Sequence, residues 1–155
     1  MKTTIIEPHK SSLGMNANMA SIVIFLAMLV VSWIPYLRWL AWAVPLVIFH
    51  MEKESAFVKF QAVQAIVLGV ASAGFSIVLQ IFIWILTPRN IHSAINYAMG
   101  RGWGAVALFG TLATIISLAF TVIEIYIIYT AYNWKQVELP FAGPIAAKAS
   151  GQFSD

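Results

Sequence analysis

The fold is decided by residues 55–86, which read SAFVKFQAVQAIVLGVASAGFSIVLQIFIWIL. Ser55 is a residue type that caps helix N-termini, because its hydroxyl accepts a hydrogen bond from a backbone N–H of the first turn. From Gln61 to Leu86 the chain carries no formal charge. As a helix this run is longer than the hydrocarbon layer of a bilayer, which is about 30 Å thick. The stretch therefore predicts one long membrane-spanning helix.

The composition extends this prediction to the whole chain. Of 155 residues, 61% are hydrophobic and only 10% are charged, so a soluble domain would lack the polar residues to cover its surface. The absence of cysteine excludes disulfides and thiolate metal sites. The net charge of +3 is dispersed along the chain, which favours contacts with lipid headgroups over binding of nucleic acid.

We expect an all-α bundle with four hydrophobic segments in a single membrane domain, residues 20–135. The segments lie at about residues 20–35, 38–51, 56–87 and 103–133, between cytoplasmic tails at 1–19 and 136–155. The second segment is short and contains Pro45, so a tilted or half-inserted helix is left open there. Proline and glycine predict a mostly irregular C-terminal tail, and the connection between the long helices is expected to carry a short surface helix at 91–99.

Charge bias predicts how these segments are oriented. With four crossings, one face carries six lysines and the other carries three arginines. The lysines are Lys2, Lys10, Lys53, Lys59, Lys135 and Lys148, and the arginines are Arg38, Arg89 and Arg101. A three-crossing arrangement divides the same residues almost evenly. The positive-inside rule therefore favours a multi-pass protein of a bacterial inner membrane with both termini in the cytoplasm.

Small and polar side chains form a row on each long segment. In 56–87 the row includes Gly69 and Ser76, and small residues of this kind let another helix approach closely. A packing seam within the chain is the favoured interpretation, and a ligand or substrate path is the alternative. In the last segment the row runs through Gly110, Thr114, Ser117, Thr121 and Glu124.

Glu124 is the only acid inside a predicted span. A carboxyl group in contact with lipid is costly to ionise, so we expect Glu124 to face protein or water and to be hydrogen-bonded or protonated. Gln64 lies at a similar depth on the preceding long helix, which predicts a polar clamp between Glu124 and Gln64. A proton or solute relay, and a contact with a partner protein, are the alternatives.

No motif in the chain specifies catalysis. The sequence has no HExxH, no usable Ser-His-Asp set, no P-loop and no GxGxxG. His50 ends the second segment among aromatic residues, where a haem or chlorophyll ligand is conceivable but a polar residue at the membrane surface is the favoured interpretation. We therefore expect no catalytic, cofactor or metal site, and a protein that is not an enzyme.

Two stretches together resemble a known family. Residues 44–65, with Val44-Pro45-Leu46 followed by SAFVKFQAVQA, are similar to the PLxxxxxxK…SxFVxFHAxQAL segment of small bacterial membrane proteins. These proteins are related to the twenty-kilodalton subunit of the chloroplast inner-envelope (Tic) protein translocon. Residues 131–143 are similar to the family's closing AxxGxxxxxPxxG, although Trp134 stands where the family has glycine, and Gln61 or Val63 where it has histidine. The family-like residues at the membrane surface are Phe57, Lys59, Phe60, Gln61, Pro140 and Gly143.

The resemblance implies a four-helix membrane domain, with a translocon role in the plastid branch and unknown functions in most bacterial relatives. We therefore expect a non-enzymatic, translocon-like or assembly subunit that contacts membrane lipids and other integral membrane proteins. One alternative is a small transporter or channel for a solute or protons that uses the Glu124 row. Another is an accessory subunit of a respiratory or photosynthetic complex.

Overall fold

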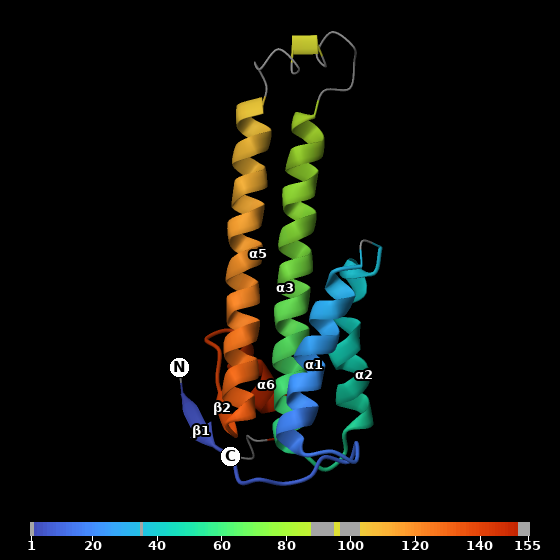
Figure 1. Cartoon of the computed structure of the whole chain (residues 1–155), viewed down its shortest axis with the longest axis vertical. Coiled ribbons are helices and arrows are strands. Elements are labelled where there is room, and N and C mark those ends of the chain that lie inside the picture. The colour runs from blue at the N-terminus through green and yellow to red at the C-terminus, as the bar shows by residue number, and fades with distance from the viewer. Residues whose placement is uncertain (1, 35, 88–94, 97–102, 152–155) are drawn as a thin grey trace. The chain divides into compact units, whose positions relative to one another are not determined.

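The computed structural model describes residues 2–34, 36–87, 95–96 and 103–151. Its two longest elements are the helices α3 (Ala56–Leu86) and α5 (Trp103–Tyr132), which confirm the predicted segments at 56–87 and 103–133 (Figure 1). Both are long and apolar enough to cross a membrane, α3 over its whole length and α5 over Ala107–Tyr132. The predicted surface helix at 91–99, with His92, lies outside the described residues except for Ile95 and Asn96, which are helical, and so do Arg89 and Arg101.

The two preceding segments form shorter helices. Helix α1 spans Ala17–Ser32, and after the 3-10 turn η1 (Arg38–Leu40) helix α2 spans only Ala43–Met51. Pro45 is the third residue of α2, where its missing N–H has no partner to lose. As a helix of nine residues, α2 reaches about 14 Å. Among the described residues only α3 and α5 meet the length of a full crossing, so four crossings are not established.

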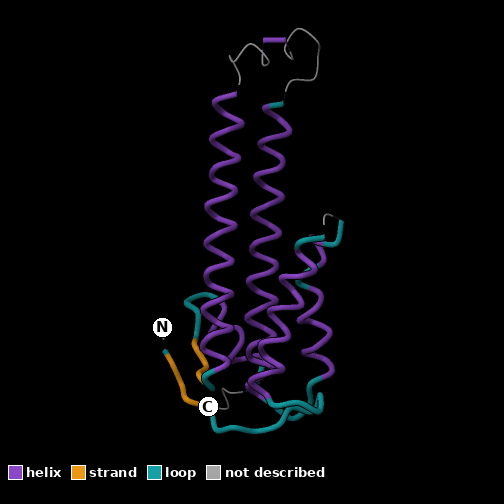
Figure 2. Tube along the Cα trace, viewed as in Figure 1, coloured by secondary structure: helices purple, strands orange, loops and turns teal. Residues whose placement is uncertain are grey.

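The structure is mostly helical, as predicted, but the described parts of both tails contain further regular structure, which corrects the prediction of an irregular C-terminal tail. Strand β1 (Thr3–Ile5) pairs antiparallel with β2 (Lys135–Val137), in orange in Figure 2, so that Thr3 faces Val137. Helix α6 (Ala142–Ala149) follows. Its Pro144 is the third helical residue, where proline is tolerated, so a residue read as a helix breaker lies in the first turn.

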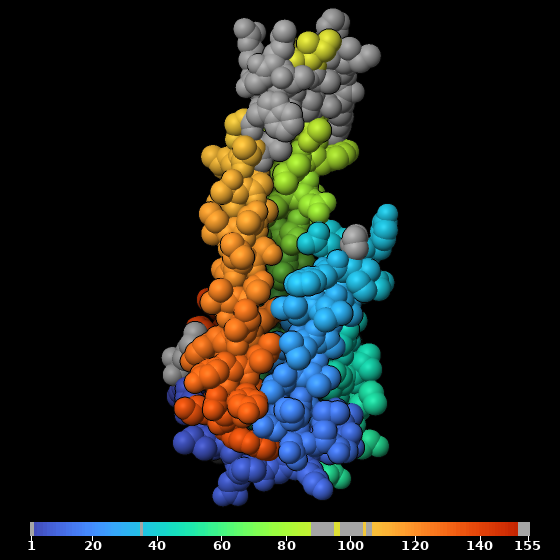
Figure 3. All heavy atoms as spheres, viewed as in Figure 1, coloured from blue at the N-terminus to red at the C-terminus, as the bar shows by residue number. Residues whose placement is uncertain are grey.

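By packing, the chain divides into two units, residues 1–71 with 123–155, and residues 72–122. In the first unit, α1 and the end of α5 cover the first half of α3 in the view of Figure 3. Phe25, Phe57, Phe60 and Ile127 are fully buried there or nearly so. In the second unit the ring of Phe82 stacks on that of Phe109, with centroids 5.6 Å apart.

Candidate functional site

The start of α3 is held by a buried carboxylate. Glu52, directly before the turn into α3, is only 2% exposed. Its Oε1 accepts hydrogen bonds from the backbone N–H and hydroxyl of Ser12 (3.1 and 2.8 Å) and from the backbone N–H groups of Glu54 and Ser55 (3.0 and 2.9 Å). The hydroxyl of Ser11 donates to Oε2. We refer to Glu52, Ser11, Ser12, Ser55 and His9 as the Glu52 cluster.

These donors keep Glu52 ionised. Burial alone would raise the pKa of the carboxyl group, but the hydrogen bonds from Ser11, Ser55 and Ser12 outweigh it and lower the pKa from 4.5 to about 2. The charge is therefore balanced by dipoles of the N-terminal segment and the α3 start. The N–H of Lys53 also donates to the Ser12 hydroxyl, at 3.0 Å. The cluster thus fastens the N-terminal segment to the connection between α2 and α3.

Ser55 caps α3 as the sequence predicts, because the N–H of Val58 donates to its hydroxyl oxygen at 3.2 Å. That oxygen also lies 2.7 Å from Nε2 of His9, whose Nδ1 is 2.8 Å from the carbonyl of Glu7. A carbonyl only accepts, so Nδ1 donates, and in the neutral ring Nε2 accepts from the Ser55 hydroxyl. A Ser–His pair at this distance resembles an activated nucleophile. However, Ser55 is 1% exposed and occupied as a cap, which supports a structural role.

Trp134 ends α5 with a left-handed backbone, at φ 57°. This conformation favours glycine and costs other residues about 1–2 kcal/mol. The indole stacks on Phe57 and packs against His9, with ring centroids 6.4 and 5.8 Å away, and these contacts offset the strain.

The predicted clamp between Glu124 and Gln64 is wrong. The Nε2 of Gln64 donates instead to the carbonyl of Val137 at 2.9 Å, because β2 folds back over α3. Within the described residues, Glu124 makes no hydrogen bond, and neither Gln64 Oε1 nor either amide atom of the fully buried Gln61 has a partner. Each unpaired buried polar group lowers the stability of the fold by about 1–3 kcal/mol. The amide groups of Gln61 and Gln64 are therefore an unfavourable polar region inside the first unit.

The two threonines of the Glu124 row donate to carbonyl groups of their own helix. The hydroxyl of Thr114 donates to the carbonyl of Gly110 at 2.9 Å, and that of Thr121 donates to the carbonyl of Ser117 at 3.0 Å. Such bonds within a helix leave the hydroxyls without need of another partner. Glu124 itself is half-buried and, unlike the two threonines, makes no such bond among the described residues.

On α3 the packing seam is confirmed at Gly69. A Cβ atom added there would lie 2.8 Å from the Cβ of Trp42 and 3.2 Å from the sulfur of Met28. Only glycine fits this contact without a shift of its neighbours. Ser76 is half-buried and belongs to the second unit, where the prediction of a seam stays untested.

The two family-like stretches meet in space. Besides the Phe57–Trp134 and Gln64–Val137 contacts, Phe60 and Val63 pack with Ala146 and Ala147 of α6. Three further positions lie around this contact. Lys59 donates to the carbonyl of Lys53 at 3.2 Å, Pro140 is exposed, and a Cβ on Gly143 would lie 2.9 Å from the Cβ of Glu138.

The described residues contain no group of three or more His, Cys, Asp or Glu that could hold a metal ion. His50 is exposed, and its Nδ1 lies 2.8 Å from the carbonyl of Leu46, to which it donates. Sequence reasoning missed Glu52, Ser11, Ser12 and the role of His9. The only local signal for them is the acid three residues before the Ser55 cap.

The fold and its apolar helices define a helical membrane protein. No family model matches the chain, and no solved structure matches it. The chain is similar to the UPF0132 membrane protein MJ1443 of Methanocaldococcus jannaschii, with 28% identity over 141 residues. The similarity covers 91% of this chain and 94% of the relative, so it includes most of both long apolar helices.

Proposed function

We propose that the protein is a non-enzymatic, multi-pass component of a membrane assembly that packs against other integral membrane proteins. The observation that carries this proposal is Glu124, a carboxyl group inside a membrane-crossing helix that makes no hydrogen bond among the described residues. An acid in such a position faces protein or water rather than lipid. A polar group of a neighbouring membrane protein supplies the missing partner.

The surroundings of Glu124 support a protein partner over a purely internal role. Val122 and Ile125, which are close to Glu124 in sequence but point to other sides of α5, are 64% and 56% exposed, as lipid-facing residues are. Because Thr114 and Thr121 bond to their own helix, the row offers a smooth face of small side chains with a single unsatisfied acid. Small residues allow close approach of a second helix, and the acid fixes its register.

The same proposal places both termini in the cytoplasm. In the first unit the β1–β2 pairing and the Glu52 cluster hold both tails and the connection before α3 at one end. This end carries Lys2, Lys10, Lys53, Lys59, Lys135 and Lys148, in keeping with the positive-inside rule. The resemblance to the Tic-related family supports protein transport as the most specific form of the proposal.

Photo-crosslinking in intact membranes tests the partner. A photoreactive amino acid at Thr121, in the Glu124 row, is expected to capture a discrete protein that mass spectrometry identifies. The same group at the more exposed Val122, on the far side of the helix from Glu124, is the matched control and is expected to capture lipid. Glu124→Gln should preserve the crosslink and Glu124→Leu should abolish it. Equal products from both positions would contradict the proposal.

The unpaired carboxyl also favours a second candidate, a small transporter or channel in which Glu124 relays protons. In that case Glu124→Gln abolishes transport in a stably folded protein, because glutamine cannot titrate. Proton flux into liposomes containing the purified protein, compared between wild type and this variant, separates the two functions. An assembly subunit gives no flux with either protein.

A further inference from the structure

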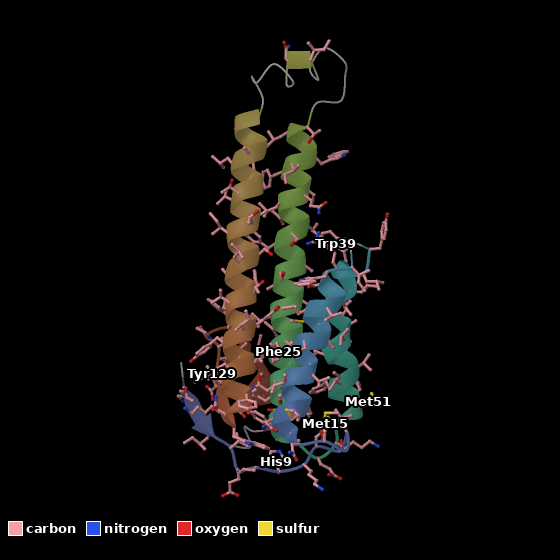
Figure 4. All side chains as sticks on the ribbon, viewed as in Figure 1. His9, Met15, Phe25, Trp39, Met51 and Tyr129 are labelled. Atoms are coloured by element: carbon pink, nitrogen blue, oxygen red, sulfur yellow. The ribbon has the colours of Figure 1, made fainter. Side chains whose placement is uncertain are left out.

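The contact at Gly69 fixes how far the α1–α2 hairpin extends along α3. Trp42, whose Cβ faces Gly69, directly precedes α2, and Met28 lies in the last turns of α1. Both residues are therefore close to the turn that joins the two helices. Figure 4 shows Trp39 at this turn and Met15 and Met51 at the opposite end of the hairpin. The turn thus begins near the level of Gly69.

Helix α3 continues well past that level. Trp84 lies about 22 Å farther along α3 than Gly69, at 1.5 Å per residue, and is 64% exposed. An exposed tryptophan near the end of an apolar helix is typical of the membrane surface. The turn that joins α1 to Trp42 consists of residues 33–41. Within it, η1 adds a rise of about 6 Å. Helix α2 and η1 together reach about 20 Å, which is less than the hydrocarbon layer of about 30 Å that a full crossing needs.

The outer surfaces of the hairpin belong in lipid. Val23, Leu26, Val30 and Val47 are 44–59% exposed and apolar. The hairpin is therefore inserted in the membrane rather than lying in water. Its open end joins the Glu52 cluster, on the side that holds both tails.

The turn itself is not apolar. Trp33 and Tyr36 are 80% and 91% exposed, and Arg38 is exposed with a guanidinium group that makes no hydrogen bond or ion pair to any described residue. A guanidinium group is among the most costly groups to place in hydrocarbon, and bilayers respond by thinning and admitting water. Arginine binds phosphate through two parallel N–H donors, and tryptophan and tyrosine prefer the headgroup region.

We propose that the α1–α2 hairpin is half-inserted and that its turn binds phospholipid headgroup phosphate, drawn inward from the far leaflet by Arg38, Trp33 and Tyr36. The bilayer beside the hairpin is then thinner than around the rest of α3. This inference does not depend on the proposed assembly function, because it requires no protein partner.

Single cysteines in this cysteine-free chain test it in sealed phospholipid vesicles. The variants are Tyr36→Cys at the turn, Val70→Cys, which is 50% exposed beside Gly69, and Thr87→Cys at the far end of α3. Fluorescence quenching by lipids labelled at known depths gives the position of each site. The rate of reaction with a membrane-impermeant maleimide, added at the far face, gives its access to water.

We expect Tyr36→Cys to lie at the depth of Val70→Cys, on the order of 10 Å deeper than Thr87→Cys, yet to react at least about tenfold faster than Val70→Cys. Adding Arg38→Leu should remove the difference in reaction rate between Tyr36→Cys and Val70→Cys. Adding Arg38→Lys should largely keep this difference in rate. A Tyr36→Cys label at the Thr87 depth would mean a full crossing and overturn the inference. A deep label as unreactive as Val70→Cys would overturn it too.

Vesicles made from uncharged glycolipids, which lack phosphate, identify the ligand. If phosphate is the ligand, the part of the Tyr36→Cys rate that depends on Arg38 is lost in these vesicles. If that part of the rate is unchanged, water alone solvates the turn and the phosphate site is refuted.

Discussion

At the scale of single residues, Glu52 is a buried charge that forms no ion pair with any residue that the structure describes. Its carboxylate is balanced by five donors, three from the backbone and two from the hydroxyls of Ser11 and Ser12. Hydrogen bonds to a charged group are stronger than those between neutral groups. Removing the charge therefore weakens the attachment of the N-terminal segment to the start of α3.

Acid should loosen this attachment. The pKa of Glu52 is about 2 in the folded protein against an ordinary 4.5, so its stabilising contribution is complete above pH 4.5 and is lost as the pH falls toward 2. The loss amounts to at most about 3 kcal/mol. Thermal unfolding in detergent, followed between pH 7 and pH 3, measures it.

The Glu52→Gln variant is the control, because the other carboxyl groups titrate equally in both proteins. It should be less stable than wild type at pH 7, and the gap should close on acidification. A gap that is constant with pH would show that the charge of Glu52 contributes nothing.

Sequence reasoning at this scale succeeded where the signal was local. The Ser55 cap follows from residue type and position, and the hydrogen bond from Val58 confirms it. The Glu52–Ser12 contact joins residues 40 positions apart, and no local sequence pattern predicts it. The pairing of Gln64 with Glu124 was inferred from depth alone, and the carbonyl of Val137 takes the amide donor instead.

At the scale of elements, the long helices were predictable and the small ones were not. Unbroken hydropathy sets the bounds of α3 and α5 to within one residue. The C-terminal segment failed as a prediction because its prolines and glycines were read as breakers. The position of each residue decides whether a helix can form. Pro144 lies in the first turn of α6, where proline is tolerated, and Gly143 allows the chain to pass close to Glu138.

Two glycines of α3 offer a matched test of the packing seam. Gly69→Ala brings a Cβ within 3.1 Å of the Trp42 backbone and should destabilise the protein by about 1–3 kcal/mol. Gly74→Ala meets no atom within 4 Å and should stabilise the helix by about 0.5–1 kcal/mol. Melting temperatures in detergent compare the two. Equal shifts would refute a tight α3–hairpin contact.

At the scale of the whole molecule, both tails and the connection before α3 meet at one end of the first unit. If this end is cytoplasmic, green fluorescent protein should fluoresce when fused to either terminus. Alkaline phosphatase fused after Thr87, beyond the end of α3, should be active because it lies outside. Phosphatase activity at either terminus, or its absence after Thr87, would reverse or reject the orientation.

The pairing of β1 with β2 has a consequence for how the protein is made. Thr3–Ile5 leaves the ribosome before all the helices of the first unit, and its partner Lys135–Val137 leaves only after α5. The first strand therefore waits unpaired until α5 has been synthesised, and the end that carries both tails closes only then. A chain whose translation stops before Lys135 keeps a free strand edge and an uncovered Gln64, both of which quality-control proteases can recognise.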